Sequence, residues 1–267
     1  MHQIHRIEDG RKFRLDDVDP DSTKGVKGKA EGLRKTEALV ARMDALQEAL
    51  FVDGRKGLLI VLQAMDTGGK DGTVRHVFRG VNPAGCNVTS FKAPTPDEAR
   101  HPFLWRATHA LPPRGGIGIF NRSYYEDVLI VRVHDLVPKD RWSRRYPRIN
   151  EWEHMLAEDG YVVLKFFLHI GPDEQKARLQ DRLDDPSKQW KFNPADVEER
   201  RHWDDYMAAY EDVIRKCSTP WAPWFVVPSN RKWYRNLVVA SAIVDALEQL
   251  DLKLPPLEYD PSTIRID

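Results

Sequence analysis

A short apolar run that breaks into a glycine-containing loop with one lysine constrains the fold of this chain most. It occupies residues 58–73, LLIVLQAMDTGGKDGT. The apolar run predicts a buried strand, Gly68 and Gly69 allow a tight turn, and apolar residues then recur at helical spacing. A loop between a strand and a helix directs backbone N–H groups, the positive end of the helix dipole and the Lys70 ammonium to one point. The segment therefore predicts a phosphate-binding loop.

Two positions depart from the common pattern G-x-x-x-x-G-K-[ST]. Ala64 stands at the first glycine, and Asp71 stands where a hydroxyl would normally bind magnesium. Asp66 also places a carboxylate in a loop that should bind anions, and like charges repel unless a cation lies between them. We interpret Asp66 as a group that holds magnesium or faces the nucleophile. The alternatives are that Asp66 caps the next helix and that the loop is an ordinary strand–turn–helix.

Five apolar segments predict the strands of one sheet, and helical patterns separate them. Strands that alternate with helices and are apolar throughout indicate a parallel sheet covered on both faces. The expected fold is therefore a three-layer α/β domain with a five-stranded parallel sheet. The predicted strands are residues 58–63, 87–91, 116–120, 161–169 and 224–227.

Helix starts are predicted from side chains that cap the first turn of a helix. A helix over 194–216 carries an aromatic and apolar stripe, which we assign to core packing. The predicted starts are Thr95 before Pro96, Ser123 with Glu126, Asn150 with Glu153, Asn193 before Pro194, and Ser229 before the last long helix.

The chain before residue 51 is predicted to be an arm followed by a helix. Leucine and methionine residues at positions 39, 43, 46 and 50 define one apolar helix face. Residues up to about Lys29 are polar, and we expect them to wrap the domain or a neighbouring subunit. The expected organisation is an arm and helix over 1–50, a core domain over 51–250 and a tail over 251–267.

The composition limits the partners and the compartment. The 41 Lys and Arg residues balance 41 Asp and Glu residues, so net charge gives no general attraction to nucleic acid. Two cysteines, Cys86 and Cys217, are too few for a disulfide framework and favour a reducing cytoplasm. The start of the chain has no apolar signal core, and no apolar run is long enough to span a bilayer. We therefore expect a soluble cytoplasmic protein that binds neither nucleic acid nor membrane.

A second polar cluster follows the third predicted strand. In phosphate-loop enzymes this strand end normally supplies a carboxylate that holds magnesium, but Asn121 takes that place here. Ser123 and Glu126 have the spacing of a capping box. Arg122 is a candidate to hold a transferring phosphoryl group, and Asp127 is a candidate to bind metal. The alternative is that Arg122 and Asp127 form an ordinary surface ion pair.

Basic residues cluster in the second half of the chain. Residues four apart share a helix face, and a row of basic faces could follow a long anion with regularly spaced charges. For each pair of basic residues taken singly, the alternative is that the pair simply lies on a solvated face of the protein. We interpret Arg200 and Arg201, which neighbour four acidic residues, as helix-surface pairs. The clustered residues are Arg141, Arg144, Arg145, Arg148, Arg178, Arg182, Lys188, Lys191, Arg231, Lys232 and Arg235.

From about residue 51 to residue 250 the chain resembles the polyphosphate kinase 2 family. The motifs that carry the resemblance are AMDTGGKDGT, FKAPT, FNRSYYEDVLIVRVH, INEWE, DDPSKQWKF and APWFVVPSNRKWYRN. The resemblance implies a phosphate-loop kinase fold with a helical lid within about residues 140–195 and inorganic polyphosphate as phosphoryl donor. Many members carry Asp-Arg-Ser where this chain has Asn121-Arg122-Ser123, and the Asn version is similar to the class III branch, which accepts both AMP and ADP.

The motifs and the resemblance together imply a role for individual residues. The expected catalytic residues are Asp66, Lys70, Arg122 and Asp127, and Asp66 and Asp127 are expected to hold magnesium, with manganese as the alternative. The expected nucleotide-binding residues are Lys92, Asn121, Arg122 and Glu126. The expected phosphate- and polyphosphate-binding residues are Thr67, Gly68, Gly69, Lys70, Asp71, Gly72, Thr73, Arg178, Arg182, Lys188, Lys191, Lys232 and Arg235.

The expected activity is a magnesium-dependent, reversible transfer of a phosphoryl group from polyphosphate to AMP or ADP, giving ADP or ATP. Adenine nucleotides are expected, with guanine nucleotides as the alternative, in a homodimer or homotetramer. An ATP-dependent nucleoside or nucleotide kinase of the same fold is the first alternative function, but it needs no extended basic surface. A GTPase-like switch is the second, and the sequence lacks the N/T-K-x-D segment that reads guanine.

Overall fold

The computed structural model describes residues 6–7, 9–254, 256–257 and 259–266, and within these residues six strands form one sheet in the order β1-β6-β5-β2-β4-β3. Five of these strands pair in parallel and confirm the predicted strands. The sixth, at one edge, pairs antiparallel with β6 and was not predicted, because two residues carry no periodicity. The strands are β1 (Arg6–Ile7), β2 (Gly57–Gln63), β3 (Cys86–Ser90), β4 (Ile117–Asn121), β5 (Tyr161–His169) and β6 (Trp224–Pro228).

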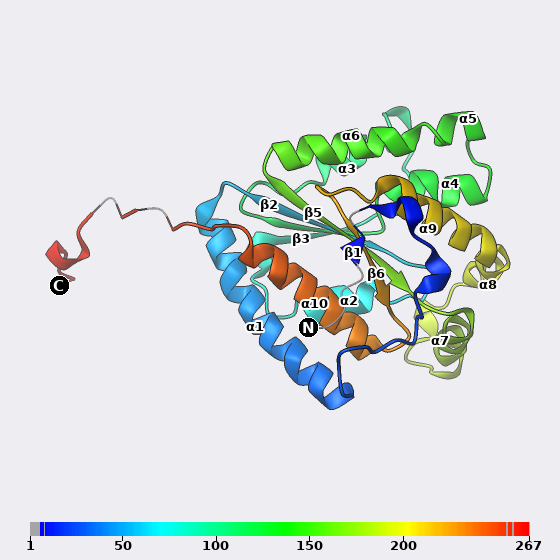
Figure 1. Ribbon diagram of the computed structural model, residues 1–267, viewed down its shortest axis with the longest axis horizontal. Coiled ribbons are helices and arrows are strands. Elements are labelled where there is room, and N and C mark those ends of the chain that lie inside the picture. The colour runs from blue at the N-terminus through cyan, green and yellow to red at the C-terminus, as the bar shows by residue number, and fades with distance from the viewer. Residues whose placement is uncertain (1–5, 8, 255, 258, 267) are drawn as a thin grey trace.

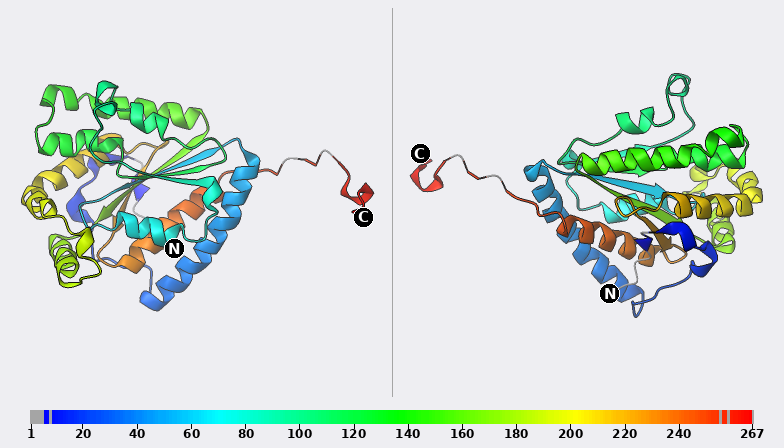
Figure 2. Two further views of the ribbon diagram at one scale, coloured as in Figure 1. Left: turned by 180° about the vertical axis from the view of Figure 1, so that it is seen from behind. Right: turned by 45° about the horizontal axis from the view of Figure 1, so that its top comes forward.

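Helices cover both faces of the sheet, as predicted for a three-layer α/β fold (Figures 1 and 2). The helices α1 (Lys29–Asp53), α2 (Lys70–Val77) and α10 (Lys232–Glu248) cover one face. The other face is covered chiefly by α6 (Arg145–Glu158) and α9 (Trp203–Cys217). No helix of the described residues is both long and apolar enough to cross a bilayer.

The strand that leads into the phosphate-binding loop divides its side chains between the two layers. Successive residues of a strand point to opposite faces. Leu58, Ile60 and Leu62 of β2 therefore pack with α1 and α10, whereas Leu59 and Val61 pack in the other hydrophobic cluster. All five side chains have no exposed surface, which explains why the segment is apolar throughout rather than alternating.

Short helices connect the main layers. The α-helices are α3 (Trp105–His109), α4 (Ile130–Val133), α5 (Lys139–Trp142), α7 (Pro172–Asp184) and α8 (Ala195–Glu199). The 3₁₀ helices are Gly10–Lys12, Leu15–Asp17, Pro83–Gly85, Glu98–Arg100, Tyr124–Val128, Gln189–Lys191, Arg200–His202 and Pro261–Thr263.

Two of the predicted helix starts are confirmed by their hydrogen bonds. The Thr95 backbone N–H donates to Glu98 Oε2 at 2.7 Å, and the Glu98 N–H donates to Thr95 Oγ1 at 3.2 Å. Asn193 Oδ1 accepts from the Ala195 N–H at 3.1 Å. The helix predicted over 194–216 is present as α8, a 3₁₀ turn and α9 in succession.

Two other predicted starts are wrong. Asn150 lies inside α6, which begins at Arg145, and its side chain instead donates to the Lys216 carbonyl in the last turn of α9 at 2.8 Å. Ser229 donates its hydroxyl to the Val227 carbonyl at 2.7 Å, and α10 begins after Arg231 without a side-chain cap. Both motifs match the capping pattern locally, but tertiary packing sets where these helices begin.

The N-terminal arm wraps its own domain. Phe13, Leu15 and Val18 are buried against the cluster that contains α9. The Leu15 N–H donates to Glu211 Oε2 at 2.8 Å, and this bond ties the arm to α9. Of the two predicted positions for the arm, the structure shows the one on the same chain.

The arm also buries His169 at the carboxyl end of β5. Burial lowers the pKa of His169 to about 4, whereas a backbone hydrogen bond with Val18 and the charges of Asp16 and Asp19 raise it. The imidazole is therefore neutral in the folded protein at neutral pH.

A buried ion pair joins β5 to the helices of the α6 and α9 layer. Lys165 Nζ donates to Glu153 Oε2 at 2.6 Å and to the Cys217 carbonyl at 2.6 Å. The Tyr124 and Tyr125 hydroxyls donate to Glu153 Oε1 at 2.7 and 2.8 Å. Lys165 and Glu153 have no exposed surface, so a low dielectric strengthens these bonds and also penalises any partner left unpaired.

We predict strong coupling between Lys165 and Glu153. Lys165→Met should lower the free energy of unfolding by about 3–5 kcal/mol because it leaves the Glu153 carboxylate buried without its cation. Lys165→Met with Glu153→Leu should cost at least ~1 kcal/mol less than the sum of the two single changes. Urea denaturation measures both values. Lys35→Met, at the half-exposed pair with Glu31, is the control and should change stability by under about 1 kcal/mol; additive losses at Lys165 and Glu153 would contradict the coupling.

We predict that His169 makes the protein acid-sensitive. Its folded pKa lies below its unfolded value, so the unfolded chain takes up the proton first and stability is lost as pH falls from about 6.5 to about 4. The loss from this group should reach about 3 kcal/mol. His169→Gln should flatten the stability profile over this range, measured by denaturation at each pH, whereas His154→Gln on the exposed face of α6 should leave the profile unchanged.

Candidate active site at the carboxyl ends of the strands

Two neighbouring parallel strands bring the two polar motifs together. β2 pairs with β4 in a register that sets Leu62 opposite Asn121. The phosphate-binding loop leaves the end of β2, and the segment that begins at Arg122 leaves the end of β4. Crevices outside the carboxyl ends of parallel strands are where α/β folds bind ligands.

The loop between β2 and α2 has the tight geometry predicted for it. Thr67 has a φ of 60° and Gly69 has a φ of 104°, and α2 then begins at Lys70. Lys70 Nζ donates to the Ala64 carbonyl at 2.8 Å and to the Met65 carbonyl at 3.4 Å. Burial lowers the pKa of Lys70, as does the Arg122 charge, and nearby carboxylates oppose this shift. The ammonium therefore lies at the N-terminus of α2, held by the carbonyls of its own loop.

Two contacts join the strand end to the loop. Arg122 Nη2 donates to Asp66 Oδ1 at 2.8 Å, and Asn121 Nδ2 donates to Asp71 Oδ1 at 2.6 Å. Burial lowers the pKa of Arg122, but the Glu126 and Asp66 carboxylates outweigh it, so the pKa lies above its usual value. Asp66 is thus a partner of Arg122, and Asp71 is a partner of Asn121.

Glu126 faces this centre and does not complete a capping box. Ser123 Oγ accepts from the Tyr125 N–H at 3.1 Å, so half of the predicted box is present. The Glu126 carboxylate instead accepts from Gln63 Nε2 at 3.1 Å, and its charge raises the pKa of both Lys70 and Arg122. Glu126 therefore lies close to both Lys70 and Arg122.

Asp127, the second predicted metal ligand, pairs with an arginine of α6. Arg145 Nη1 donates to Asp127 Oδ1 and to the Asp127 carbonyl, both at 2.8 Å. Burial raises the pKa of Asp127 to about 6, against the charges of Arg145 and Arg106. Of the two predicted metal ligands, Asp127 is therefore a partner of Arg145, whereas Asp66 is a partner of Arg122.

Two further residues, Gln175 and Arg200, hold the backbone of Asp66 through a chain of hydrogen bonds. Gln175 Nε2 donates to the Asp66 carbonyl at 3.0 Å. Arg200 Nη1 donates to Gln175 Oε1 at 2.6 Å and to the Pro172 carbonyl at 2.9 Å. The interpretation of Arg200 as a surface pair is therefore wrong, whereas Arg201 does pair with Glu198 at 2.6 Å.

A second carboxylate near the centre was also missed. Asp196 on α8 has its pKa raised by burial and then by the Asp66 charge, whereas Arg182, Arg122 and Lys70 lower it. Asp196 Oδ2 lies 3.4 Å from Arg182 Nη1. No motif marks Asp196, because it reaches the loop only through the fold of α7 and α8.

The predicted basic residues fall into two groups. Arg178, Lys232 and Arg235 lie close enough for their charges to interact, beside the phosphate-binding loop. Most of the others lie on exposed segments, and several have local partners: Lys188 pairs with Asp181 and Asp185, Arg148 with Glu151 and Arg231 with Asp21, and the Lys191 ammonium lies over the Trp190 ring. Arg145 and Arg182 are largely buried, in pairs with Asp127 and Asp196. The Lys92 side chain is exposed.

Arg178 has a structural role in its present position. Its guanidinium donates to the Thr67 carbonyl at 2.9 Å and to the Ser229 carbonyl at 2.7 Å. It also pairs with Glu174 at 2.7 Å and is almost fully buried. Arg178 therefore joins the phosphate-binding loop to the segment that precedes α10.

Comparisons with known proteins identify the family and the relatives that this chain resembles. A family model described as Polyphosphate kinase 2 matches residues 27–255. An AMP/ADP-polyphosphate phosphotransferase of Meiothermus ruber is 49% identical over 264 residues, which cover 98% of this chain and 99% of the relative. An ADP-polyphosphate phosphotransferase of Rhodopseudomonas palustris is 46% identical over 228 residues, 81% of this chain and 79% of the relative.

A solved structure shows the same fold. Polyphosphate kinase 2 from Arthrobacter aurescens TC1 superposes with a TM-score of 0.93 at 48% sequence identity, covering 97% of this chain and 92% of that one. The resemblance identified from the motifs is confirmed. The chain has the phosphate-loop kinase fold and belongs to the polyphosphate kinase 2 family.

Proposed function

We propose that this protein transfers a phosphoryl group from inorganic polyphosphate to AMP or ADP. The Meiothermus ruber relative is named an AMP/ADP-polyphosphate phosphotransferase, which supports both acceptors. The observation that carries the proposal is a group of three cations, Arg178, Lys232 and Arg235, packed beside the phosphate-binding loop.

The three cations repel one another. Burial and, after it, the Arg178 charge lower the pKa of Arg235 to about 9. Burial also lowers the pKa of Lys232, and Arg178 and Arg235 act in the same direction. Arg235 is almost fully buried, and among the described residues its side-chain hydrogen bonds go only to Asn236 Oδ1. Such a cluster is stabilised by an anion of high charge, and a polyphosphate chain supplies one.

The glycines of the loop leave space for this cluster. A Cβ atom on Gly69 would lie 1.8 Å from Arg235 Nη1, and one on Gly72 would lie 3.2 Å from Arg235 Nη2. Arg235 therefore occupies the space that side chains at these two positions would fill. We propose that the donor runs from this cluster over Thr67, Gly68, Gly69 and Thr73 toward Lys70.

The proposed chemistry requires alignment more than bond-making by the protein. An oxygen of the acceptor phosphate attacks the terminal phosphorus of polyphosphate, the bridging P–O bond breaks, and the shortened chain leaves with the bond electrons. Lys70 and Arg122 neutralise charge on the equatorial oxygens, and Asn121, Glu126 and Lys92 orient the nucleotide. The acceptor phosphate is already ionised and needs no strong general base.

The residues present fit a divalent cation. Magnesium is commonly held by one or two carboxylates together with substrate phosphates, and Asp66 and Asp196 supply two interacting carboxylates at the loop. Among the described residues no group of three or more acidic, histidine or cysteine side chains is placed to hold a metal alone. We propose magnesium, with manganese as the alternative; the ion would neutralise the charge on phosphate oxygens.

We also propose a lid over this site, a division of the chain into three segments and a cytoplasmic location. The segment over about 140–195, with Arg182, Lys188 and Lys191, acts as the lid over the substrates. Residues 1–50 form the arm and helix, 51–250 the kinase domain and 251–267 the tail. Cys86 and Cys217 are free, which agrees with a cytoplasmic protein.

We predict that Lys70→Met lowers turnover on the order of a hundred- to a thousandfold, because a donor to the transferring group is lost. The assay incubates the protein and magnesium with AMP or ADP, with and without polyphosphate, and separates the nucleotides by chromatography. Lys35→Met on α1 is the control and should keep full activity. Near-normal turnover of Lys70→Met, or product formed only with ATP as donor, would contradict the proposal.

We predict that Gly69→Ala raises the KM for polyphosphate by about tenfold or more. The reason is that the new methyl group displaces the Arg235 guanidinium, which weakens the binding of polyphosphate. Gly54→Ala separates this clash from backbone strain. Gly54 also has a positive φ, 66°, but a Cβ there would meet nothing nearer than 4.0 Å. Gly54→Ala should cost about 1 kcal/mol of stability and leave the KM unchanged; equal effects of both changes on KM would contradict the role of Arg235.

A further inference from the structure

Four successive carbonyl groups of the phosphate-binding loop, those of residues 64–67, accept hydrogen bonds from side chains. The Lys70 ammonium donates to the first two, at 2.8 and 3.4 Å. Gln175 Nε2 donates to the third at 3.0 Å, and Arg178 Nη1 donates to the fourth at 2.9 Å. Carbonyl oxygens repel an anion, so a loop that binds phosphate through its N–H groups needs its carbonyls turned toward other donors.

Thr67 lies between the last two of these carbonyls and has an unusual backbone. Its φ is 60°, a conformation that a residue other than glycine keeps only where its surroundings hold it. In a trans peptide the C=O and N–H groups point in opposite directions. The Asp66 carbonyl faces Gln175, so the Thr67 N–H points away from Gln175. Within the described part of the chain, this N–H and the buried Thr67 Oγ1 have no hydrogen-bond partner, and a ligand or water normally satisfies such groups.

The direction of the Gln175 amide decides whether it can hold the Asp66 carbonyl. A glutamine side chain ends in an acceptor oxygen and a donor nitrogen, and rotation exchanges the two. Arg200 Nη1, which can only donate, lies 2.6 Å from Gln175 Oε1 and 2.9 Å from the Pro172 carbonyl. It keeps the amide oxygen on its own side, so the amide nitrogen faces Asp66. Gln175 is only 1% exposed, so bulk water does not replace Arg200 as the donor.

Arg200 is itself fixed through the residue before it. The Tyr206 hydroxyl donates to Glu199 Oε2 at 2.8 Å, and Glu199 Oε1 lies 2.9 Å from His134 Nε2. These contacts tie the turn between α8 and α9 to α9 itself and to the end of α4. From this turn, the Arg200 relay runs through Arg200 and the Gln175 amide to the carbonyl of the phosphate-binding loop.

We propose that Arg200 is a positioning residue for the phosphate-binding loop. Through the Gln175 amide it sets the direction of the peptide that joins Asp66 to Thr67, and so directs the Thr67 N–H toward the polyphosphate donor. The part of this inference that concerns polyphosphate rests on the proposed function, whereas the part that concerns the shape of the loop does not.

The first test compares Arg200→Met with Arg201→Met. Arg201 is the matched control, because it is the next residue, is 75% exposed and pairs with Glu198 at 2.6 Å. Arg200→Met should raise the KM for polyphosphate about tenfold, since a misdirected N–H loses its hydrogen bond to the phosphate. The KM for the nucleotide should change by less than about twofold. A smaller folded fraction would lower the apparent kcat without raising either KM, so this pattern separates positioning from a loss of structure.

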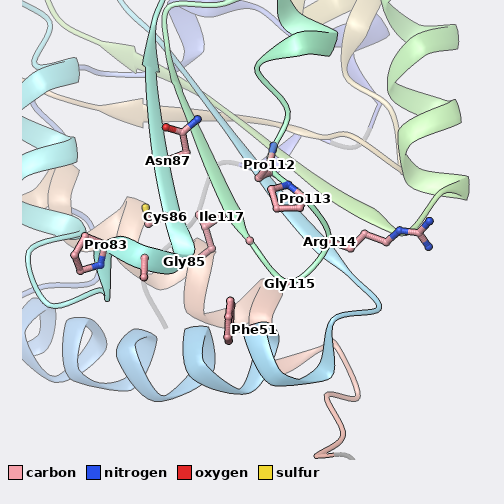
Figure 3. Close-up of a pocket in the computed structure, with 12 residues that line it drawn as sticks. Phe51, Pro83, Gly85, Cys86, Asn87, Pro112, Pro113, Arg114, Gly115 and Ile117 are labelled. Carbon is pink, nitrogen blue, oxygen red and sulfur yellow. The ribbon is translucent and has the colours of Figure 1, made fainter.

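A second control removes a positive charge far from the loop. Arg114 borders a hollow at the amino ends of β3 and β4, whereas the phosphate-binding loop lies at the carboxyl ends of the strands (Figure 3). Arg114→Met and Arg201→Met should both leave the KM for polyphosphate unchanged. An unchanged KM in Arg200→Met, or an equal rise in either control, would overturn the proposal.

The second test asks whether Arg200 acts through the Gln175 amide. Gln175→Leu keeps a buried side chain of similar size but has no donor for the Asp66 carbonyl, so it should raise the KM for polyphosphate at least as much as Arg200→Met. Adding Arg200→Met to Gln175→Leu should then change this KM by less than about twofold, because the relay is already broken. Increases that multiply in the double variant would show that the two residues act separately, which is the opposite of the proposal.

The third test does not depend on the proposed function. The Gly68 N–H donates to the Met65 carbonyl at 2.9 Å, so its hydrogen exchange reports whether the loop keeps its shape. Arg200→Met and Gln175→Leu should speed exchange in the loop peptide at least about threefold, measured by mass spectrometry, and Arg201→Met should leave the rate unchanged. If the wild-type protein shows no polyphosphate-dependent turnover, the proposed function fails while the exchange rates still test the relay. Exchange at the wild-type rate in Arg200→Met and Gln175→Leu would rule the relay out.

Discussion

The parallel pairing of β2 with β4 is the constraint on which the site depends. It sets the end of the strand before the phosphate-binding loop opposite Asn121, so that Arg122 reaches Asp66 and Asn121 reaches Asp71. A shift of one residue would turn both side chains to the other face of the sheet. The alternation of β2 side chains between two hydrophobic clusters fixes this register, because either shift would leave both layers mispacked.

The buried charges of Lys165 and Glu153 are compensated differently from the buried charge of Arg235. The buried pair of Lys165 and Glu153 is fully hydrogen-bonded and joins β5 to the helices on one face. Arg235, by contrast, has neighbours of the same sign and an amide oxygen as its hydrogen-bond partner. A protein retains such an imbalance at a binding site, where the ligand completes the electrostatics.

The fold was predictable because its signals are local and periodic. The five parallel strands, the loop at Lys70 and the helix before β2 all follow from apolar patterns and glycine placement within short windows. The contacts of Gln175, Arg200 and Asp196 could not be predicted, because they join residues far apart in the sequence. For the same reason the sequence could not show that Arg145 forms an ion pair with Asp127. It also could not show that Asn150 lies inside α6, because tertiary packing sets where that helix begins.

The hydrogen bonds of Lys70 to Ala64 and Met65 have a consequence for the order of events in a turnover. The ammonium is satisfied by its own loop, so an arriving phosphate must compete with two carbonyl oxygens for it. Part of the interaction energy of the first phosphate is therefore used to reorganise the loop, which weakens ground-state binding. In the proposed reaction, the same carbonyls accept the lysine again after each transfer.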